Sequence, residues 1–122
     1  MMYSSRVLEE FYNPEHYGVI KGAHAVGKVV SDIGSEILKI FITVEGDKVA
    51  AAEFQAFGGV VAIACTSVAN NLMIGKKLAD IKKLNVNNIL EVLGEIPENK
   101  MYLAQAAVNA MHLAVENYQN KN

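Results

Sequence analysis

Few residues in this chain are of the types that bind metals or act as nucleophiles. There is one cysteine, Cys65, and there are three histidines, His16, His24 and His112. The histidines lack the His-x3-His spacing of a metal site, and no Ser–His–Asp order or phosphate-binding glycine loop is present. No motif therefore indicates an independent enzyme.

Cys65 lies in an apolar stretch, AIACTS, with helical spacing. A free cysteine in such a place most often acts as a small buried hydrophobe, and we expect this of Cys65. A reactive thiol would need a positive neighbour or a helix N-terminus to lower its pKa, and no basic residue is close in sequence. A metal shared between the Cys65 thiols of two chains is a further alternative.

The composition is typical of one globular domain, residues 1–122. The chain is 52% hydrophobic and 20% charged, which excludes a disordered chain. The net charge of −2 and the absence of a basic run argue against nucleic-acid binding. The N-terminus lacks the apolar core of a signal peptide, and the apolar stretch Ala56–Ile74 is interrupted by polar residues and glycines. We therefore expect a cytoplasmic protein without a membrane contact.

The first half of the chain predicts one helix and one hairpin. Ser4–Tyr12 has helical spacing, begins with two serines that can cap it, and ends before Pro14. Gly18–Gly34 contains four glycines and is expected to be irregular or weakly paired. Ile37–Val44 and Lys48–Phe57, joined by a Gly-Asp turn, are typical of a β-hairpin.

The second half is predicted to be helical. The expected elements are Val60–Met73, ended by Gly75; a short turn or helix at Lys77–Lys83; a short helix capped by Asn87 or Asn88 that stops at Gly94; and Pro97–Tyr118. The last has a broad apolar face rich in alanine, which allows close packing on a sheet. The fold class is α+β: a small hairpin-based antiparallel sheet, helices packed on it and a long C-terminal helix.

Five segments carry a wider pattern. They are Tyr3–Gly18, Ser31–Val44, Glu53–Ser67, Ile74–Ile81 and Glu95–Tyr118. In this order and spacing they resemble the IscU/NifU N-terminal family, the scaffolds on which iron–sulfur clusters are assembled. The resemblance covers nearly the whole chain and implies the same α+β fold.

The resemblance also implies three ligand positions, and none of them holds a cysteine here. Asp32–Glu36 resembles the family's Cys-Gly-Asp loop, with Gly34 at the cysteine, Ser35 at the glycine and Glu36 at the aspartate. Gly59 stands at the cysteine of a Phe-Gly-Cys loop. In Lys100–Leu103, which resembles Lys-Leu-His-Cys, Tyr102 replaces the histidine and Leu103 the cysteine.

We therefore expect no resident cofactor, although an iron–sulfur cluster or zinc would be the family's ligand. Soft thiolates hold iron–sulfur centres, and a lone carboxylate such as Glu36 cannot make a tetrahedral or cluster site. Glu36, Cys65 and His24 are the only outside candidates for a metal, and His24 is the histidine expected to come nearest to the former site. The leucine at the third ligand position, Leu103, can also be explained by stability alone, because a buried leucine stabilises a fold by about 1.5–3 kcal/mol.

Family members act by docking, so the resemblance also implies partners. They are a cysteine desulfurase and a chaperone that binds a Leu-Pro-Pro-Val-Lys segment. In the matching segment Ile96, Pro97 and Lys100 retain the pattern, but Glu98-Asn99 is more polar and more flexible, which argues against chaperone recognition.

Two functions from different classes follow. The first is a scaffold-like protein without cluster ligands, a non-catalytic binding or regulatory module that engages a cysteine desulfurase or a complete scaffold. The second is a repurposed small-ligand or metal-binding domain that uses the emptied pocket. A self-assembling homo-oligomer is a third possibility, because the apolar fraction is high for so small a domain.

Overall fold

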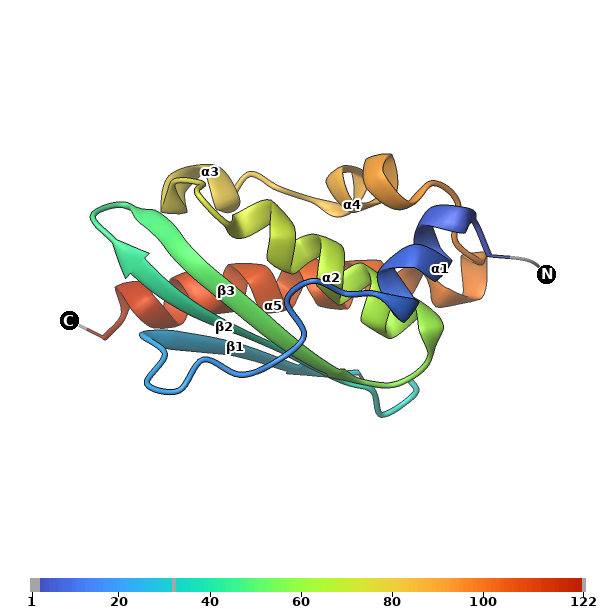
Figure 1. Cartoon of the computed structure of the whole chain (residues 1–122), viewed down its shortest axis with the longest axis horizontal. Coiled ribbons are helices and arrows are strands. Elements are labelled where there is room, and N and C mark those ends of the chain that lie inside the picture. The colour runs from blue at the N-terminus through green and yellow to red at the C-terminus, as the bar shows by residue number, and fades with distance from the viewer. Residues whose placement is uncertain (1–2, 32, 122) are drawn as a thin grey trace.

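The predicted hairpin forms the larger part of the sheet. In the computed structural model, which describes residues 3–31 and 33–121, β2 (Ile37–Glu45) and β3 (Lys48–Phe57) run antiparallel and turn at Gly46, where φ is 63°. Every second residue of β2 is buried, from Leu38 to Val44, so one face of the sheet carries the core. The α+β class is confirmed (Figure 1).

β1 (Ala25–Val30) shows that the expectation of an irregular Gly18–Gly34 segment is wrong over these six residues. β1 pairs antiparallel with β2 along its whole length, which gives the strand order β1-β2-β3. Gly27 lies in this strand because the backbone of α5 (Met101–Gln119) passes directly against it, and a Cβ there would collide with the carbonyl of Ala110. The glycine marks a close approach rather than a loop.

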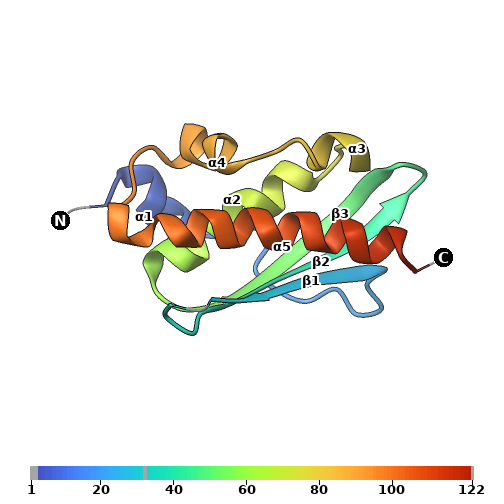
Figure 2. The ribbon, with the colours of Figure 1, turned by 180° about the vertical axis from the view of Figure 1, so that it is seen from behind.

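Two helices, α2 (Val60–Met73) and α5, cover the apolar face of the sheet (Figures 1 and 2). α5 packs on β1 and β2, and α2 packs on β3 and on α5. Buried alanines keep α5 close to its neighbours: Ala104, Ala107, Ala110 and Ala114 are all fully buried. No helix within residues 3–31 and 33–121 is long and apolar enough to cross a membrane.

Shorter helices complete the layer. α1 (Ser5–Tyr12) and α4 (Val86–Leu93) pack on α2, and α3 (Leu78–Ile81) packs on α5. The serine cap predicted for α1 is confirmed, because the Ser4 hydroxyl accepts a hydrogen bond from the Val7 N–H at 3.1 Å.

The predicted starts of two helices need correction. Asn85, rather than Asn87 or Asn88, caps α4, and the Asn88 side chain closes the box by accepting from the Asn85 N–H at 2.8 Å. α5 begins at Met101 and not at Pro97, because a tight 3-10 turn, η1 (Glu98–Lys100), intervenes. The Lys100 N–H donates to the Pro97 carbonyl at 2.9 Å and closes that turn.

Candidate functional site

The three segments that correspond to the family's ligand loops meet around the side chain of Glu36. Glu36 precedes β2, and its carboxyl group lies against Gly34 in the loop after β1. Its Cγ lies beside Gly58, in the turn between β3 and α2. Its Oε2 accepts a hydrogen bond of 2.7 Å from the hydroxyl of Tyr102 in the first turn of α5. Asp32, the first residue of the loop, lies outside the described residues.

The Glu36 carboxylate is buried and only half satisfied. The residue is 8% exposed, and its Oε1 has no hydrogen-bond partner among the described residues. Burial raises the pKa of this carboxyl, but the hydrogen bond from Tyr102 and the charge of Lys100 contribute to a net pKa below the usual value. The same hydrogen bond, with burial and the charge of Glu36, raises the pKa of the Tyr102 hydroxyl. At neutral pH Glu36 is therefore an anion held by a protonated phenol.

Ser35 holds the loop in a conformation that favours glycine. Its φ is 61°, and it is the one non-glycine residue of the described ranges with a positive φ. The left-handed region costs an L-residue roughly 1–2 kcal/mol. This is the position at which the resemblance to the family places a glycine, so the backbone conformation of Ser35 fits the residue that the family pattern has there.

The three ligand positions differ in how much room they leave. A Cβ at Gly34 would collide with the Glu36 carboxyl group, the flexible end of a side chain. A Cβ at Gly59, the N-cap of α2, would meet nothing within 4 Å. Leu103 is 1% exposed and belongs to the hydrophobic core. One position is thus occupied by a neighbour, one is open and one has joined the core.

Cys65 is buried in α2 and belongs to no cluster of potential metal ligands among the described residues. The residue is fully buried in α2, and burial raises the pKa of its thiol to about 12. It is therefore protonated at neutral pH and shielded from solvent. The expectation of a small buried hydrophobe is confirmed.

His24 does not approach the site, and the expectation that it would is wrong. It precedes β1, whereas the site lies beyond the other end of that strand. Six strand residues at about 3.3 Å each separate the two ends by roughly 20 Å. The Nδ1 of His24 accepts a hydrogen bond of 2.9 Å from the Val44 N–H, which is a structural role.

The other histidines also make structural contacts. The Nδ1 of His16 lies 2.7 Å from Glu53 Oε2, and the Nε2 of His112 lies 3.0 Å from the carbonyl oxygen of Leu84. Across residues 3–31 and 33–121, no three histidine, cysteine, aspartate or glutamate side chains come together as a potential metal site.

The segment that resembles the chaperone-binding motif leads directly into the first turn of α5, which carries Tyr102 and Leu103. Pro97 precedes the turn η1, Ile96 packs on the core and Lys100 is half-buried next to α5. Because Glu98–Lys100 forms a 3-10 turn, this part of the segment is folded rather than extended. Its use as a partner-binding site stays a prediction.

A pocket of about 220 Å³ adjoins the site between the end of β1 and α5. It is lined by Val30, Ser31, Ile33, Tyr102, Ala106 and Asn109, together with Val29. Ile33 and Val30 are 74% and 54% exposed. The sequence pattern indicates Tyr102 but not this apolar rim, because the pocket exists only once β1 and α5 lie side by side.

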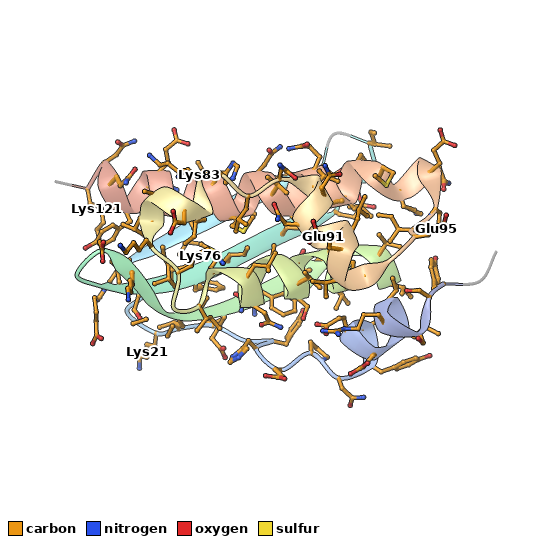
Figure 3. All side chains as sticks on the ribbon, turned by 90° about the horizontal axis from the view of Figure 1, so that it is seen from above. Lys21, Lys76, Lys83, Glu91, Glu95 and Lys121 are labelled. Atoms are coloured by element: carbon orange, nitrogen blue, oxygen red, sulfur yellow. The ribbon has the colours of Figure 1, made fainter. Side chains whose placement is uncertain are left out.

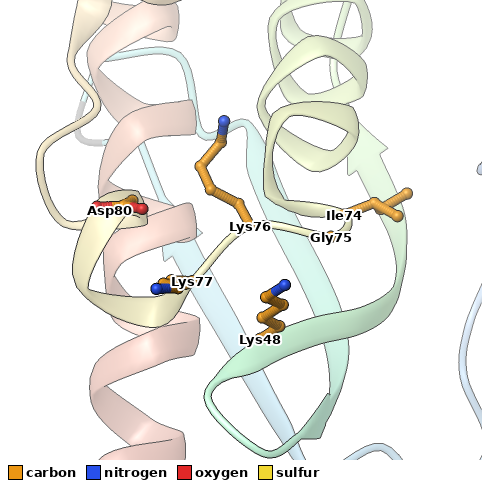
Figure 4. Close-up of a pocket in the computed structure, with 6 residues that line it drawn as sticks. All are labelled: Lys48, Ile74, Gly75, Lys76, Lys77 and Asp80. Atoms are coloured by element: carbon orange, nitrogen blue, oxygen red, sulfur yellow. The ribbon is translucent and has the colours of Figure 1, made fainter.

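A larger pocket, of about 310 Å³, lies elsewhere (Figure 4). Lys48, Ile74, Gly75, Lys76, Lys77 and Asp80 line it. It adjoins the C-terminus of α2, whereas Gly59 caps the N-terminus, so 14 helical residues and roughly 20 Å separate it from the emptied site. The labelled lysines of Figure 3 lie in the same half of the molecule, and Glu91 and Glu95 lie in the other. This pocket is basic and solvated, and none of the predicted site residues lies in it.

Comparison with known proteins decides the family. The NifU-like N terminal domain matches residues 2–122. The chain belongs to this family. It is 33% identical over 121 residues to the iron-sulfur cluster assembly scaffold protein IscU 1 of Archaeoglobus fulgidus, covering 99% of the chain and 79% of that protein. It is 35% identical to the nitrogen fixation protein NifU of Azotobacter chroococcum over 98% of the chain, but this spans only 39% of that longer protein.

Solved structures share the fold. A NifU-like N-terminal domain from Brucella abortus superposes with a TM-score of 0.80 at 16% identity, covering 98% of this chain and 95% of that one. A putative scaffold protein for the SUF system from Fervidobacterium islandicum gives 0.74 at 19% identity, covering 93% and 96%. The predicted resemblance is thus confirmed. This NifU-like domain has one cysteine, Cys65, and lacks the ligand cysteines of its family.

Proposed function

We propose that this chain is a non-catalytic binding or regulatory module of iron–sulfur cluster assembly, which engages a cysteine desulfurase or a complete scaffold without holding a cluster. The observation that carries the proposal is that side chains without thiols fill two of the three positions that resemble the family's ligand positions. The Glu36 carboxyl group occupies the place of one ligand side chain, and Leu103, at another ligand position, is buried in the core. The family fold is otherwise kept over the full length.

The chemistry of the remaining groups supports this proposal. An iron–sulfur cluster needs several soft sulfur ligands, and the site offers one carboxylate and one phenol. The one thiol of the chain is buried in α2, with a pKa of about 12. Glu36 already accepts a hydrogen bond from Tyr102, which gives it a structural partner in place of a metal. We therefore propose a role through docking rather than through catalysis.

The proposal is tested first by metal and sulfide analysis of protein purified without oxygen, before and after attempted cluster reconstitution. A colourless, folded, metal-free protein is expected. Stoichiometric iron and sulfide in the wild-type chain would overturn the proposal. Binding to a desulfurase and to a complete scaffold is then measured with purified components, and no complex at micromolar concentration with either would contradict the docking role.

A matched control shows whether only the ligands were lost. The variant Gly34→Cys, Gly59→Cys, Leu103→Cys should bind zinc or a cluster if the surrounding geometry is intact. Because the Glu36 carboxyl group stands where the Gly34→Cys side chain would begin, adding Glu36→Asp should raise metal binding further. A folded variant that stays metal-free in both forms would show that the loop geometry has also diverged.

A second candidate function is a small-ligand or metal site in the emptied pocket. The unpartnered Oε1 of Glu36 and the open space at Gly59 favour it, because a buried acceptor without a donor is costly. A ligand there would shift the backbone amide signals of Gly34 and Gly59 and raise the unfolding midpoint, and Glu36→Gln would weaken it. Titration with zinc and with small amines that leaves these signals unmoved would exclude this candidate.

The homo-oligomer predicted from the apolar composition also stays a proposal. It is measured by analytical ultracentrifugation over a range of protein concentrations. A single monomeric species throughout would exclude it.

A further inference from the structure

β1 forms a free edge of the sheet, and only half of that edge is covered. Figure 2 shows β1 at the border of the sheet with no strand beyond it. Near its beginning, the Asn117 side chain donates to the Val26 carbonyl at 2.8 Å, and Lys121 Nζ donates to the His24 carbonyl at 2.7 Å. Two side chains from the end of α5 thus take the place of a neighbouring strand there.

No side chain of the described residues covers the second half of the edge with hydrogen bonds of this kind. The Val26 carbonyl points away from β2, and the Ser31 N–H points toward β2, where it donates to the Glu36 carbonyl at 2.8 Å. Alternation along the strand therefore directs the N–H and C=O groups of Lys28 and Val30 outward. Among the described residues these groups have no hydrogen-bond partner. An extended segment can pair with them as an added strand.

The charges on this edge select the occupant. Lys28 and Lys39 stand directly opposite each other, on the open face of the sheet, and neither forms an ion pair among the described residues. Like charges in this position repel. A second copy paired through the same strand and centred on Lys28 would add further positive charge, so self-pairing is disfavoured. An acidic residue opposite Lys28 would instead be attracted to both lysines.

The pocket beside the edge favours an aliphatic residue next to the acidic residue of the added strand. In an added strand, neighbours of the residue opposite Lys28 point to the other face, toward α5. There the 220 Å³ pocket, lined by Ile33, Tyr102 and Ala106 among others, can receive an aliphatic side chain. The matching segment is therefore extended, with an acidic residue flanked by an aliphatic one.

We propose that the uncovered edge of β1 docks an extended acidic and aliphatic segment of a partner protein, which adds a fourth strand and places an aliphatic side chain in the pocket between β1 and α5. The proposal goes beyond the proposed function, because it requires no particular cluster-assembly partner. Its failure would leave docking to a desulfurase or a scaffold elsewhere on the surface untouched.

The test measures fluorescence anisotropy of a labelled peptide, TTVEVTTS, and of its charge-swapped form TTVKVTTS, on the whole chain. The wild type should bind the acidic peptide with a dissociation constant below about 1 mM and prefer it to the basic one. Lys28→Glu should reverse the preference, with about a tenfold loss for the acidic peptide. Amide signals of Lys28, Val30 and Tyr102 should shift on binding.

A proline at position 30 provides a backbone test. Val30→Pro removes an outward N–H without breaking a bond to β2, and an edge strand tolerates such a proline. It should weaken binding of the acidic peptide by about tenfold, whereas the control Val30→Ala, which keeps the N–H, should lose less. Circular dichroism checks that both variants fold. The proposal would be overturned by absence of binding by the wild type, by binding of the acidic peptide to Lys28→Glu and Val30→Pro as tight as to the wild type, or by signal shifts confined to residues outside β1 and the pocket that Tyr102 lines.

Discussion

Two carboxylates are buried in the described part of the chain, Glu10 in α1 and Glu36 before β2, each 8% exposed. Both oxygens of Glu10 have partners: Oε1 accepts from the Ser67 hydroxyl at 2.6 Å, and Oε2 lies 3.2 Å from Arg6 Nε. Among residues 3–31 and 33–121, Glu36 has a hydrogen-bond partner for Oε2 only, the hydroxyl of Tyr102. Glu10 fixes one helix on another, whereas Glu36 lies in the site that the proposed function treats as a former ligand site. A buried carboxylate with both oxygens paired is typical of a structural contact, whereas an unpaired buried oxygen is rare and supports the proposal that Glu36 lies in a former ligand site.

The largest difference in stability is expected when each carboxylate is removed in turn. Glu10→Ala leaves the fully buried Ser67 hydroxyl without its acceptor and removes the contact with Arg6, so the free energy of unfolding should fall by about 2–3 kcal/mol. Glu36→Ala also removes an unpartnered buried oxygen, so its effect should stay within about 1 kcal/mol. Urea denaturation of both variants measures the difference. Equal losses would show that Glu36 is as structural as Glu10.

Removing the hydroxyl that donates to each carboxylate should give a smaller difference of the same kind. Ser67→Ala deprives a buried carboxylate of one donor and should cost about 1–2 kcal/mol, with Ser67→Thr as a control that keeps the hydroxyl. Tyr102→Phe should lower the free energy of unfolding by less, because Tyr102 is only partly buried and water can take the place of its hydroxyl beside Glu36 Oε2. Thermal unfolding of the three variants gives the order. A larger loss for Tyr102→Phe than for Ser67→Ala would show that stability depends more on the contact of Glu36 than on that of Glu10.

The loop that holds Gly34 should gain stability from a glycine at position 35. Ser35 has a φ of 61°, and Ser35→Gly removes the steric cost of that conformation. Part of the gain is offset because glycine has more freedom in the unfolded chain, so we expect a net stabilisation of about 0.5–1 kcal/mol. Ser35→Ala, which keeps a Cβ at the same positive φ, serves as the control and should not stabilise the loop. A destabilised Ser35→Gly variant would mean that the serine makes a contact of its own.

Local patterns predicted most of the fold but not β1 or the site contacts. The hairpin is visible in its partial apolar alternation and its Gly46-Asp47 turn, and α2 is visible in its long apolar run between Gly59 and Gly75. β1 was missed because the four glycines of Gly18–Gly34 indicate a loop, while Gly27 is explained only by the passing backbone of α5. The same omission placed His24 wrongly, since a paired strand separates it from the site. The bond between Tyr102 and Glu36 joins residues 66 positions apart, and neither has a sequence pattern that names the other.

The smallest expected effect is a pH dependence confined to Glu36. Its pKa in the folded state lies below the usual value, so its ionised form is favoured by folding. The stability that it contributes is present above the unfolded pKa, about 4.3, and is lost as pH falls through the lower folded pKa. The free energy of unfolding of the wild type, relative to that of Glu36→Gln, should therefore be smaller below about pH 4.3 than at pH 6. A difference that is constant from pH 6 to pH 3 would show that the pKa of Glu36 is the same in the folded and unfolded states, and a wild type favoured more at pH 3 than at pH 6 would show that burial outweighs the hydrogen bond from Tyr102 and the charge of Lys100.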